Sequence, residues 1–414
     1  MSKIKIKNFG PVKDGFQNNG GWLDINKVTV FIGNQGAGKS TVAKLISTLI
    51  WIEKSLVRGD YDAKWFERKG INRFKSQFLP YHRLDAYLYP ESIIEYQGDA
   101  YSILYQNERL TINKISNSSY SLPQIMYVPA ERNFLTYIKG AKELKLSSEA
   151  LQEFNTEYYN AQQDMKGAVE LPINGTVIEY DKLNDTLNLK GENYKVKLTD
   201  ASSGFQSFVP LYLVSSFLAN SVKSHTENKE SMSSEEKIRF QKQVQEIWNN
   251  SAFTEEQKRL ALSALSAKFN KTAFVNIVEE PEQNLFPSSQ WQMLQSLLAL
   301  NNMNSDNKLI ITTHSPYLIN YITIAIKAKQ VLNSFSKDKK ENLSDKISPL
   351  LSINSCINAY DVSIYEMEES TGIIKSLSKY NDLIPSDDNF LNNMLSETNN
   401  LFAELQEIEE ENEN

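Results

Sequence analysis

The sequence predicts an α/β fold with a mixed central sheet, an antiparallel β lobe and helical insertions. Segments 27–32, 274–278 and 308–312 are rich in apolar and β-branched residues, as strands buried on both faces are. A segment with helical spacing of apolar residues follows each of these strands: 40–56, 290–300 and 316–332. Strands that alternate with helices in this way indicate the α/β class.

Shorter patterns fill in the rest of the expected fold. Residues 92–105 and 110–115 predict antiparallel strands around turns at Gly98 and Asn107, and 176–198 predicts a meander. Further elements are expected as strands at 3–7, 125–128 and 361–366 and as helices at 141–165, 208–219 and 389–407.

We therefore expect five parts along the chain. They are an N-terminal lobe (1–140), a segment with a helix and the meander (141–219), a polar helical insertion (220–271), a C-terminal lobe (272–375), and a C-terminal helix with an acidic tail (376–414).

Composition limits the classes to which the protein can belong. The net charge of −7 disfavours nonspecific binding of DNA by the whole surface, although a local basic groove stays open. The single cysteine, Cys356, excludes an intramolecular disulfide, which fits a reducing, cytoplasmic compartment. No apolar run reaches the roughly 18 residues of a membrane span, and the N-terminal sequence lacks the pattern of a secretory signal.

The strongest functional signal is the sequence GNQGAGKS, from Gly33 to Ser40. It matches the pattern G-x-x-x-x-G-K-[ST] between a predicted strand and a predicted helix, which is the context of a phosphate-binding loop. The loop N–H groups and the positive end of the helix dipole attract phosphate. We expect Lys39 to reach the β- and γ-phosphates and Ser40 to bind Mg²⁺. The other candidate contacts are Asn34, Gly36, Ala37, Gly38 and Thr41.

Two carboxylates end the second buried strand, within FVNIVEEPEQNLFP. In P-loop enzymes the carboxylate that faces the metal emerges at this end of a strand. We assign Glu279 to the Mg²⁺ shell, through water, and Glu280 to orienting and deprotonating the attacking water. A strand that ends in solvated acids is the alternative interpretation.

Two weaker motifs follow the same logic. His314 ends the strand in LIITTHSP, where a neutral imidazole can hydrogen-bond the γ-phosphate or the attacking water, whereas His82 and His225 have no comparable context. In DASSGFQS, before a predicted helix, Ser203 and Gly204 can bind phosphate. Taken alone, that sequence is an ordinary turn and helix cap.

In this order the four motifs resemble the ABC-type ATPase head, which transporter nucleotide-binding domains, SMC proteins and the overcoming-lysogenization-defect (OLD) family share. Ser203, Gly204 and Gln206 match the LSGGQ signature, and Phe205 replaces its second glycine. EEPEQNLFP, together with IKNFGPVKD and YVPAERN, is similar to AAA-type ATPases of the OLD-like branch. Many of those are encoded in bacterial anti-phage defence operons.

The resemblance implies a P-loop NTPase fold with ATP and Mg²⁺ as cofactors, and catalytic roles for Lys39, Glu280 and His314. Two copies would stack head to tail, so that the signature of one copy, including Gln206, caps ATP on the phosphate loop of the other. Asn284 falls in the family's D-loop, which crosses between the sites. For the family's Q-loop glutamine, Gln124 and Arg132 both remain candidates.

The sequence also departs from its relatives. The 100 residues after His314 contain no D-x-D motif of a TOPRIM nuclease, and the insertions are too short for SMC coiled-coil arms. Our leading hypothesis is therefore a defence ATPase, a sensor or scaffold that works with a separate effector such as a TOPRIM or HNH nuclease or a toxin. PARIS-type and Septu-type two-gene systems are the nearest patterns, and a phage protein would be the trigger. The alternatives are an SMC-like ATPase for DNA ends or repair, a transporter's energy module, and a scaffold that binds ATP without hydrolysing it.

Overall fold

The structure is a computed structural model of the chain. It describes all residues except 1, 69, 116–119, 138–145, 228–233, 255–256, 259–260, 263–264, 266–271, 335–342, 381 and 414. Its strands form a seven-stranded mixed sheet, a five-stranded antiparallel sheet and a four-stranded antiparallel sheet. The mixed central sheet, the antiparallel lobe and the helices confirm the predicted α/β class.

The seven-stranded central sheet has the order β2-β16-β15-β4-β14-β13-β8. Its strands are β2 (Gly15–Phe16), β4 (Val28–Gly33), β8 (Pro123–Val128), β13 (Ala273–Glu279), β14 (Lys308–Thr312), β15 (Val362–Met367) and β16 (Ile373–Ser376). The five-stranded sheet contains β1 (Ser2–Phe9), β3 (Leu23–Ile25), β5 (Leu88–Gln97), β6 (Tyr101–Gln106) and β7 (Arg109–Lys114). The four-stranded sheet contains β9 (Val169–Glu170), β10 (Val177–Asp181), β11 (Thr186–Lys190) and β12 (Lys195–Lys197).

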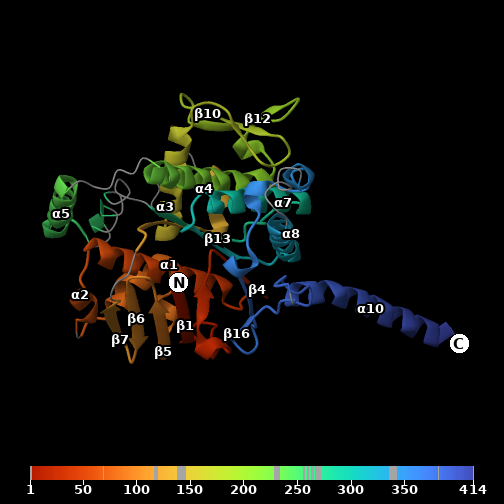
Figure 1. Cartoon of the computed structure of the whole chain (residues 1–414), viewed down its shortest axis with the longest axis horizontal. Coiled ribbons are helices and arrows are strands. Elements are labelled where there is room, and N and C mark those ends of the chain that lie inside the picture. Colours follow the sequence, from red (N-terminus) through yellow and green to blue (C-terminus); the bar gives the residue numbers. More distant parts are fainter. Residues whose placement is uncertain are drawn as a thin grey trace.

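Helix α1 (Lys39–Arg58) covers one face of the central sheet, and α3 (Glu149–Asp164), α4 (Ser203–Glu227), α7 (Pro287–Asn302) and α8 (Pro316–Asn333) cover the other (Figure 1). Further helices are α2 (Ala63–Glu67), α5 (Ser234–Asn249) and α10 (Phe390–Glu413). Among the described residues, no helix combines the length and the apolar character that a membrane crossing requires.

Two separate cores lie on opposite faces of the central sheet, because side chains alternate along each strand. Val28, Val30 and Ile32 of β4 pack in the core with α3, α4, α7 and α8. Phe31 of the same strand packs in the other core, with α1 and the five-stranded sheet. Helix α1 thus lies between the central sheet and the antiparallel lobe (Figure 1).

The parallel part of the sheet positions the predicted site. Strands β8, β13, β14, β4 and β15 all run in the same direction. Ile277 of β13 lies opposite Ile310 of β14, which lies opposite Thr29 of β4. In this register the carboxyl ends of the strands, at Gly33, Glu279 and Thr312, meet at one edge of the sheet.

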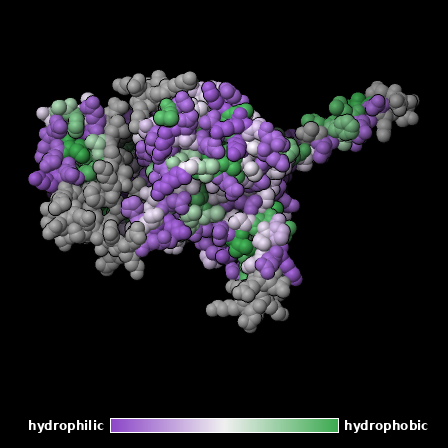
Figure 2. All heavy atoms as spheres, turned by 90° about the horizontal axis from the view of Figure 1, so that it is seen from above, coloured by the Kyte–Doolittle hydropathy of each residue, from purple (hydrophilic) through white to green (hydrophobic). Residues whose placement is uncertain are grey.

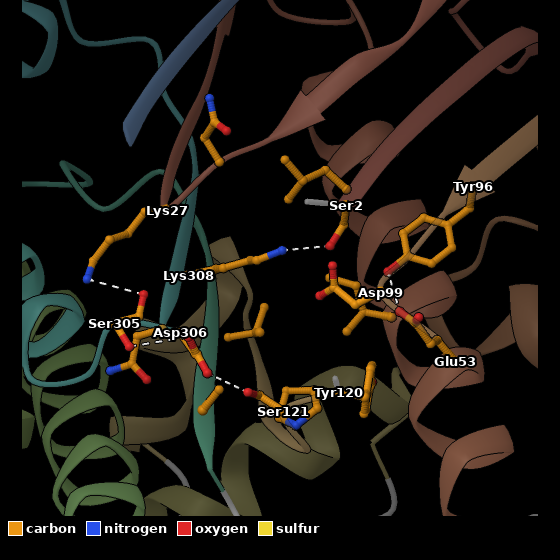
Figure 3. A pocket seen from close by; sticks show the side chains of 17 residues that line it. Ser2, Lys27, Glu53, Tyr96, Asp99, Tyr120, Ser121, Ser305, Asp306 and Lys308 are labelled. Atoms are coloured by element: carbon orange, nitrogen blue, oxygen red, sulfur yellow. Dashed lines mark hydrogen bonds between the residues drawn. The ribbon is translucent and has the colours of Figure 1, made fainter. Parts of the chain in front are cut away.

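A cavity of about 410 Å³ opens at the opposite edge, where β4, β8, β13 and β14 begin (Figure 3). The Lys308 ammonium crosses it to donate to Ser2 Oγ at 2.7 Å. On its far side the Tyr96 hydroxyl donates to the buried carboxylate of Glu53 at 2.8 Å. Since the phosphate loop follows the carboxyl end of β4, this cavity is separate from the predicted site.

Several boundaries differ from those expected. Helix α4 begins at Ser203, so Ser203, Gly204 and Gln206 lie in its first turns and not before it. Pro210 lies inside this helix, where it lacks the N–H that would bond the carbonyl of Gln206, but burial of α4 in the core outweighs that loss. Residues 220–227, assigned to the insertion, continue α4, and residues 141–145 of the helix expected at 141–165 lie outside the described part.

The C-terminal helix is longer than expected. Helix α10 extends to Glu413, so the acidic run that we expected as a separate tail is helical. Glutamate has a high helix propensity, which explains the extension. The helix projects from the body of the molecule, and Met394, Leu401 and Leu405 along it are exposed (Figures 1 and 2).

Replacing Gly33 by alanine should lower the free energy of unfolding by about 2 kcal/mol or more, because of backbone strain and a steric clash. Gly33 has a φ of 141°, and a Cβ there would lie 2.3 Å from the carbonyl oxygen of Met367. Urea unfolding monitored by tryptophan fluorescence measures the change. Gly59→Ala is the matched control, because Gly59 also has a positive φ (78°) but open space around it. It should cost only about 1 kcal/mol, and equal losses in both variants would contradict the clash.

Candidate active site

The phosphate loop connects β4 to α1. Gly38 has a φ of 98° and caps α1, which begins at Lys39. The first N–H groups of any helix lack partners within it, so this end attracts an anion. The Lys39 ammonium is buried and donates to the carbonyls of Gly33 and Asn34, both at 2.8 Å. The residues present therefore suit a bound triphosphate.

The charge of Lys39 is sensitive to its surroundings. Burial lowers the pKa of the Lys39 ammonium to about 8, although the carboxylates of Glu280, Glu282 and Glu369 oppose this shift. Glu369 was not predicted from the sequence. Glu369 lies in the turn between β15 and β16, and its carboxylate accepts a hydrogen bond from the Asn34 side chain at 2.9 Å.

Glu279, the last residue of β13, is buried and held from three sides. The Tyr127 hydroxyl donates to Oε1, the Ala130 N–H donates to Oε2 at 3.2 Å, and the Lys44 ammonium lies 3.5 Å from Oε1. Lys44 lies one helical turn after Ser40. The carboxylate therefore faces the first turns of α1, where a metal shell was expected.

Glu280 follows directly after β13 and has a left-handed backbone with a φ of 42°. Its N–H donates to the Thr312 carbonyl at 2.9 Å, which ties it to the end of β14. Its Oε1 lies 3.5 Å from His314 Nε2. A hydrogen bond from His314, together with the nearby charges of Lys39 and Arg132, lowers the pKa of Glu280. The carboxylate is thus ionised and partly exposed, as a group that orients water must be.

His314 lies between Lys39 and Glu280. Its Nδ1 is 3.5 Å from the Lys39 ammonium and its Nε2 faces Glu280. An ammonium can only donate and an ionised carboxylate can only accept, so the neutral tautomer with its proton on Nε2 satisfies both neighbours. The structure thus brings Lys39, Glu280 and His314 together, as expected from the sequence.

Glu282 holds this histidine and was missed by the sequence analysis. Its Oε1 accepts from the His314 N–H and from the Thr313 hydroxyl, both at 2.8 Å. Burial raises the pKa of the Glu282 carboxyl. The only signal for this residue is its place as the third glutamate in EEPE, two positions after Glu280.

A cavity of about 260 Å³ adjoins the start of α1 and offers oxygen ligands. Its lining includes the side chains of Ser40, Thr41, Tyr127 and Glu131. Among the residues that the structure describes, no three Asp, Glu, His or Cys side chains are grouped for a metal ion. A Mg²⁺ ion usually takes one or two protein oxygens and completes its shell with phosphate and water. Ser40, with Thr41 or Glu131 in the same lining, suits that role, although the sequence analysis predicted Glu279 and not Glu131; Glu279 does not line this cavity.

The signature residues occupy a different part of the molecule. Ser203 is exposed at the start of α4, and no hydrogen bond between described residues joins it or Gly204 to the phosphate loop. Gln206, expected to contact nucleotide, is buried. Its amide donates to the carbonyls of Thr199 and Ala201 at 2.9 and 3.1 Å and accepts from the Tyr137 hydroxyl at 2.6 Å.

No hydrogen bond between described residues joins either Q-loop candidate to the phosphate loop. Gln124 lies at the start of β8, at the far edge of the central sheet. Arg132 is fully buried and binds backbone carbonyls. Of the remaining histidines, His82 is buried against Tyr127 and His225 is exposed on α4.

Residues 60–319, more than half of the chain, match the family model described as an AAA ATPase domain. The chain belongs to this AAA ATPase domain family. Proteins of the family bind nucleotide, and the chain is accordingly an ATPase with a P-loop NTPase fold. The matched stretch includes Glu280 and His314, whereas the phosphate loop precedes it. No curated protein matches the chain in sequence.

Solved structures similar to this AAA ATPase include ABC and SMC heads. The SMC head domain from Thermotoga maritima is 12% identical with a TM-score of 0.31, over 77% of this chain and 90% of that chain. An Smc head domain from Pyrococcus furiosus is 10% identical with a TM-score of 0.33, over 98% and 100%. The ATP-binding cassette MJ0796 is 12% identical with a TM-score of 0.29, over 92% and 100%.

ATP should bind this protein more weakly as the pH rises through about 8. The Lys39 ammonium has a pKa of about 8, and its neutral form no longer attracts phosphate. Above this pH the Kd of a fluorescent ATP analogue should increase by up to about tenfold per pH unit. In Lys39→Arg the side chain stays charged, so any residual binding should lose this dependence. A Kd that is constant from pH 7 to 9.5 in the unsubstituted protein would contradict the assignment.

Proposed function

We propose that this ATPase hydrolyses ATP at an interface between two copies of the chain, stacked head to tail. The observation that carries the proposal is the separation of two half-sites. Lys39, Glu280 and His314 gather at one edge of the central sheet, while Ser203 is exposed at the start of α4. The free N–H groups at a helix start can bind the γ-phosphate of ATP held by a second copy.

In this mechanism each residue has a chemical role. Lys39 neutralises the β- and γ-phosphates, and Mg²⁺ held through Ser40 supplies further charge stabilisation when bound. Glu280 takes a proton from water as the water oxygen bonds the γ-phosphorus, and the bond to the ADP oxygen breaks. His314 orients that water or the γ-phosphate, with Glu282 fixing its backbone. The side-chain amide of Gln206 donates to the Thr199 carbonyl and so stabilises the signature turn, the first turn of α4 from Ser203 to Ser207.

Glu280→Gln should retain ATP binding, lose hydrolysis and form an ATP-dependent dimer. The amide cannot take the proton from water, so the closed state persists. Light scattering with and without Mg-ATP measures the mass. Adding Ser203→Glu should abolish this association through repulsion of the γ-phosphate while leaving ATP binding intact. Ser396→Glu adds the same charge on the projecting helix α10 and should have no effect. A Glu280→Gln variant that stays monomeric in saturating ATP would contradict the stacked site.

The biological setting that we propose is anti-phage defence in the bacterial cytoplasm. Support comes from the EEPEQNLFP, IKNFGPVKD and YVPAERN motifs, which resemble those of OLD-like ATPases. The chain would act as a sensor or regulatory scaffold, and its nucleotide cycle would hold or release a separate effector nuclease or toxin. Dimer closure that depends on ATP is a suitable switch for this purpose, because the bound and hydrolysed states differ in assembly.

Cells that express the chain with its neighbouring genes should resist phage, and Lys39→Ala should remove that protection. The lysine change deletes the charge on which phosphate binding depends. Plating efficiency measures protection, with Gly59→Ala as a control outside the site. Protection that survives Lys39→Ala would contradict the defence role. ATPase activity that duplex DNA stimulates, with steep salt dependence, would instead favour the SMC-like alternative.

A further inference from the structure

Arg132 lies at the junction of three segments that meet behind the site. It belongs to the short helical segment Ala130–Tyr137, directly after β8, and its side chain is fully buried. All of its hydrogen-bond acceptors are backbone carbonyls. Nε donates to Ser207 at 3.0 Å, Nη1 to Pro129 at 3.2 Å and to Glu279 at 2.7 Å, and Nη2 to Glu280 at 2.7 Å.

Such a burial is costly, since a charge removed from water loses several kcal/mol of hydration, and the hydrogen bonds to these carbonyls offset that loss. Burial lowers the pKa of Arg132 to about 10, against the opposing charges of Glu282, Glu280 and Glu279. The guanidinium therefore stays cationic at neutral pH. Its rigid planar fork reaches carbonyls on three segments at once, which a lysine ammonium cannot do.

One of those segments is the signature turn. Ser207 lies in α4, one turn after Ser203, and its hydroxyl accepts a hydrogen bond from Asn284 at 3.0 Å. Gly204 packs against the same loop, since a Cβ at this position would lie 2.8 Å from the Asn284 carbonyl. The start of α4 is thus held against the loop that follows Glu280.

A second of these segments, the end of β13 and the residue after it, carries Glu280 itself. A non-glycine residue with a left-handed backbone costs roughly 1–3 kcal/mol and persists only where its surroundings hold it. Three hydrogen bonds hold the Glu280 backbone. Its N–H donates to Thr312, and its carbonyl accepts from Arg132 at 2.7 Å and from the Gln283 N–H at 3.1 Å. Movement of the Arg132 guanidinium would therefore turn the Glu280 backbone and displace its carboxylate from His314.

We infer that Arg132 is a positioning residue that couples the signature turn of α4 to the catalytic backbone of Glu280. Because it binds both Ser207 and Glu280, a displacement of the start of α4 in one copy also displaces the Glu280 backbone of that copy. When Ser203 engages ATP on a second copy, the displacement of α4 passes through Arg132 and sets Glu280 for its own ATP. This inference rests on the proposed function for the roles of Ser203 and Glu280.

Arg132→Lys keeps the charge and removes the fork, and it should lower kcat at least about tenfold with KM for ATP unchanged within about twofold. Steady-state hydrolysis gives both constants, and thermal unfolding reports whether the variant is folded. Arg73→Lys is the matched control. Arg73 is also largely buried, but it lies against Trp65, away from the site, so its replacement should leave kcat unchanged.

Arg132→Gln provides a second variant in case Arg132→Lys does not fold. Its shorter, neutral amide cannot join Ser207 and Glu280 as the guanidinium does, so it should also lower kcat at least about tenfold without changing KM. A folded Arg132→Lys variant with unchanged kcat, or with kcat/KM lost entirely through KM, would overturn the coupling. If Arg132→Lys does not fold, an unchanged kcat in a folded Arg132→Gln variant would overturn it instead.

A failure of the proposed function would show up separately. In the Glu280→Gln background, Arg132→Lys should still dimerise with ATP, because Ser203 and the phosphate loop are intact. Absence of ATP-dependent dimers in Glu280→Gln alone would contradict the shared site itself. Dimers in Glu280→Gln that Arg132→Lys abolishes would assign Arg132 to assembly and would also overturn the coupling.

Discussion

The parallel register of β4, β14 and β13 is the constraint on which the site depends. Because these strands end at the same edge, the phosphate loop, the Glu279–Glu280 pair and His314 meet, although they are far apart in sequence. The backbone hydrogen bond from Glu280 to Thr312 continues this alignment one residue beyond the strand. A slip of one residue would turn every inward side chain of a strand to the opposite core, so the two cores fix the register.

Around this edge the charges are arranged as a chain of mutually dependent groups. Burial lowers the pKa of the Lys39 ammonium, and the surrounding carboxylates oppose that shift. His314 separates that ammonium from Glu280, and Glu282 holds the histidine from behind. The positions of the residues that would face ATP therefore depend on backbone hydrogen bonds and on residues behind them, such as Glu282.

Sequence patterns were sufficient where one local feature decides the outcome. The glycine loop, the buried strands and the residues at their ends were predicted because spacing and hydrophobicity specify them. Glu282, Glu131 and Glu369 were missed because their roles come from tertiary neighbours that no local pattern encodes. Residues 203–207 were predicted as a turn and helix cap before a helix at 208–219, because serine and glycine favour such positions; in the structure they form the start of the buried helix α4.

The division into two cores has a consequence for how such a protein changes over generations. Helix α1 packs in one core, with the antiparallel lobe and one face of the central sheet, whereas α4 packs in the other core, with the opposite face of that sheet and the helices that cover it. A volume change on either side can be compensated by local neighbours and does not cross the sheet. The sequences of the core around α1, next to the phosphate loop, and of the core around α4 can thus change at different rates during evolution, provided that the strands between them keep their register.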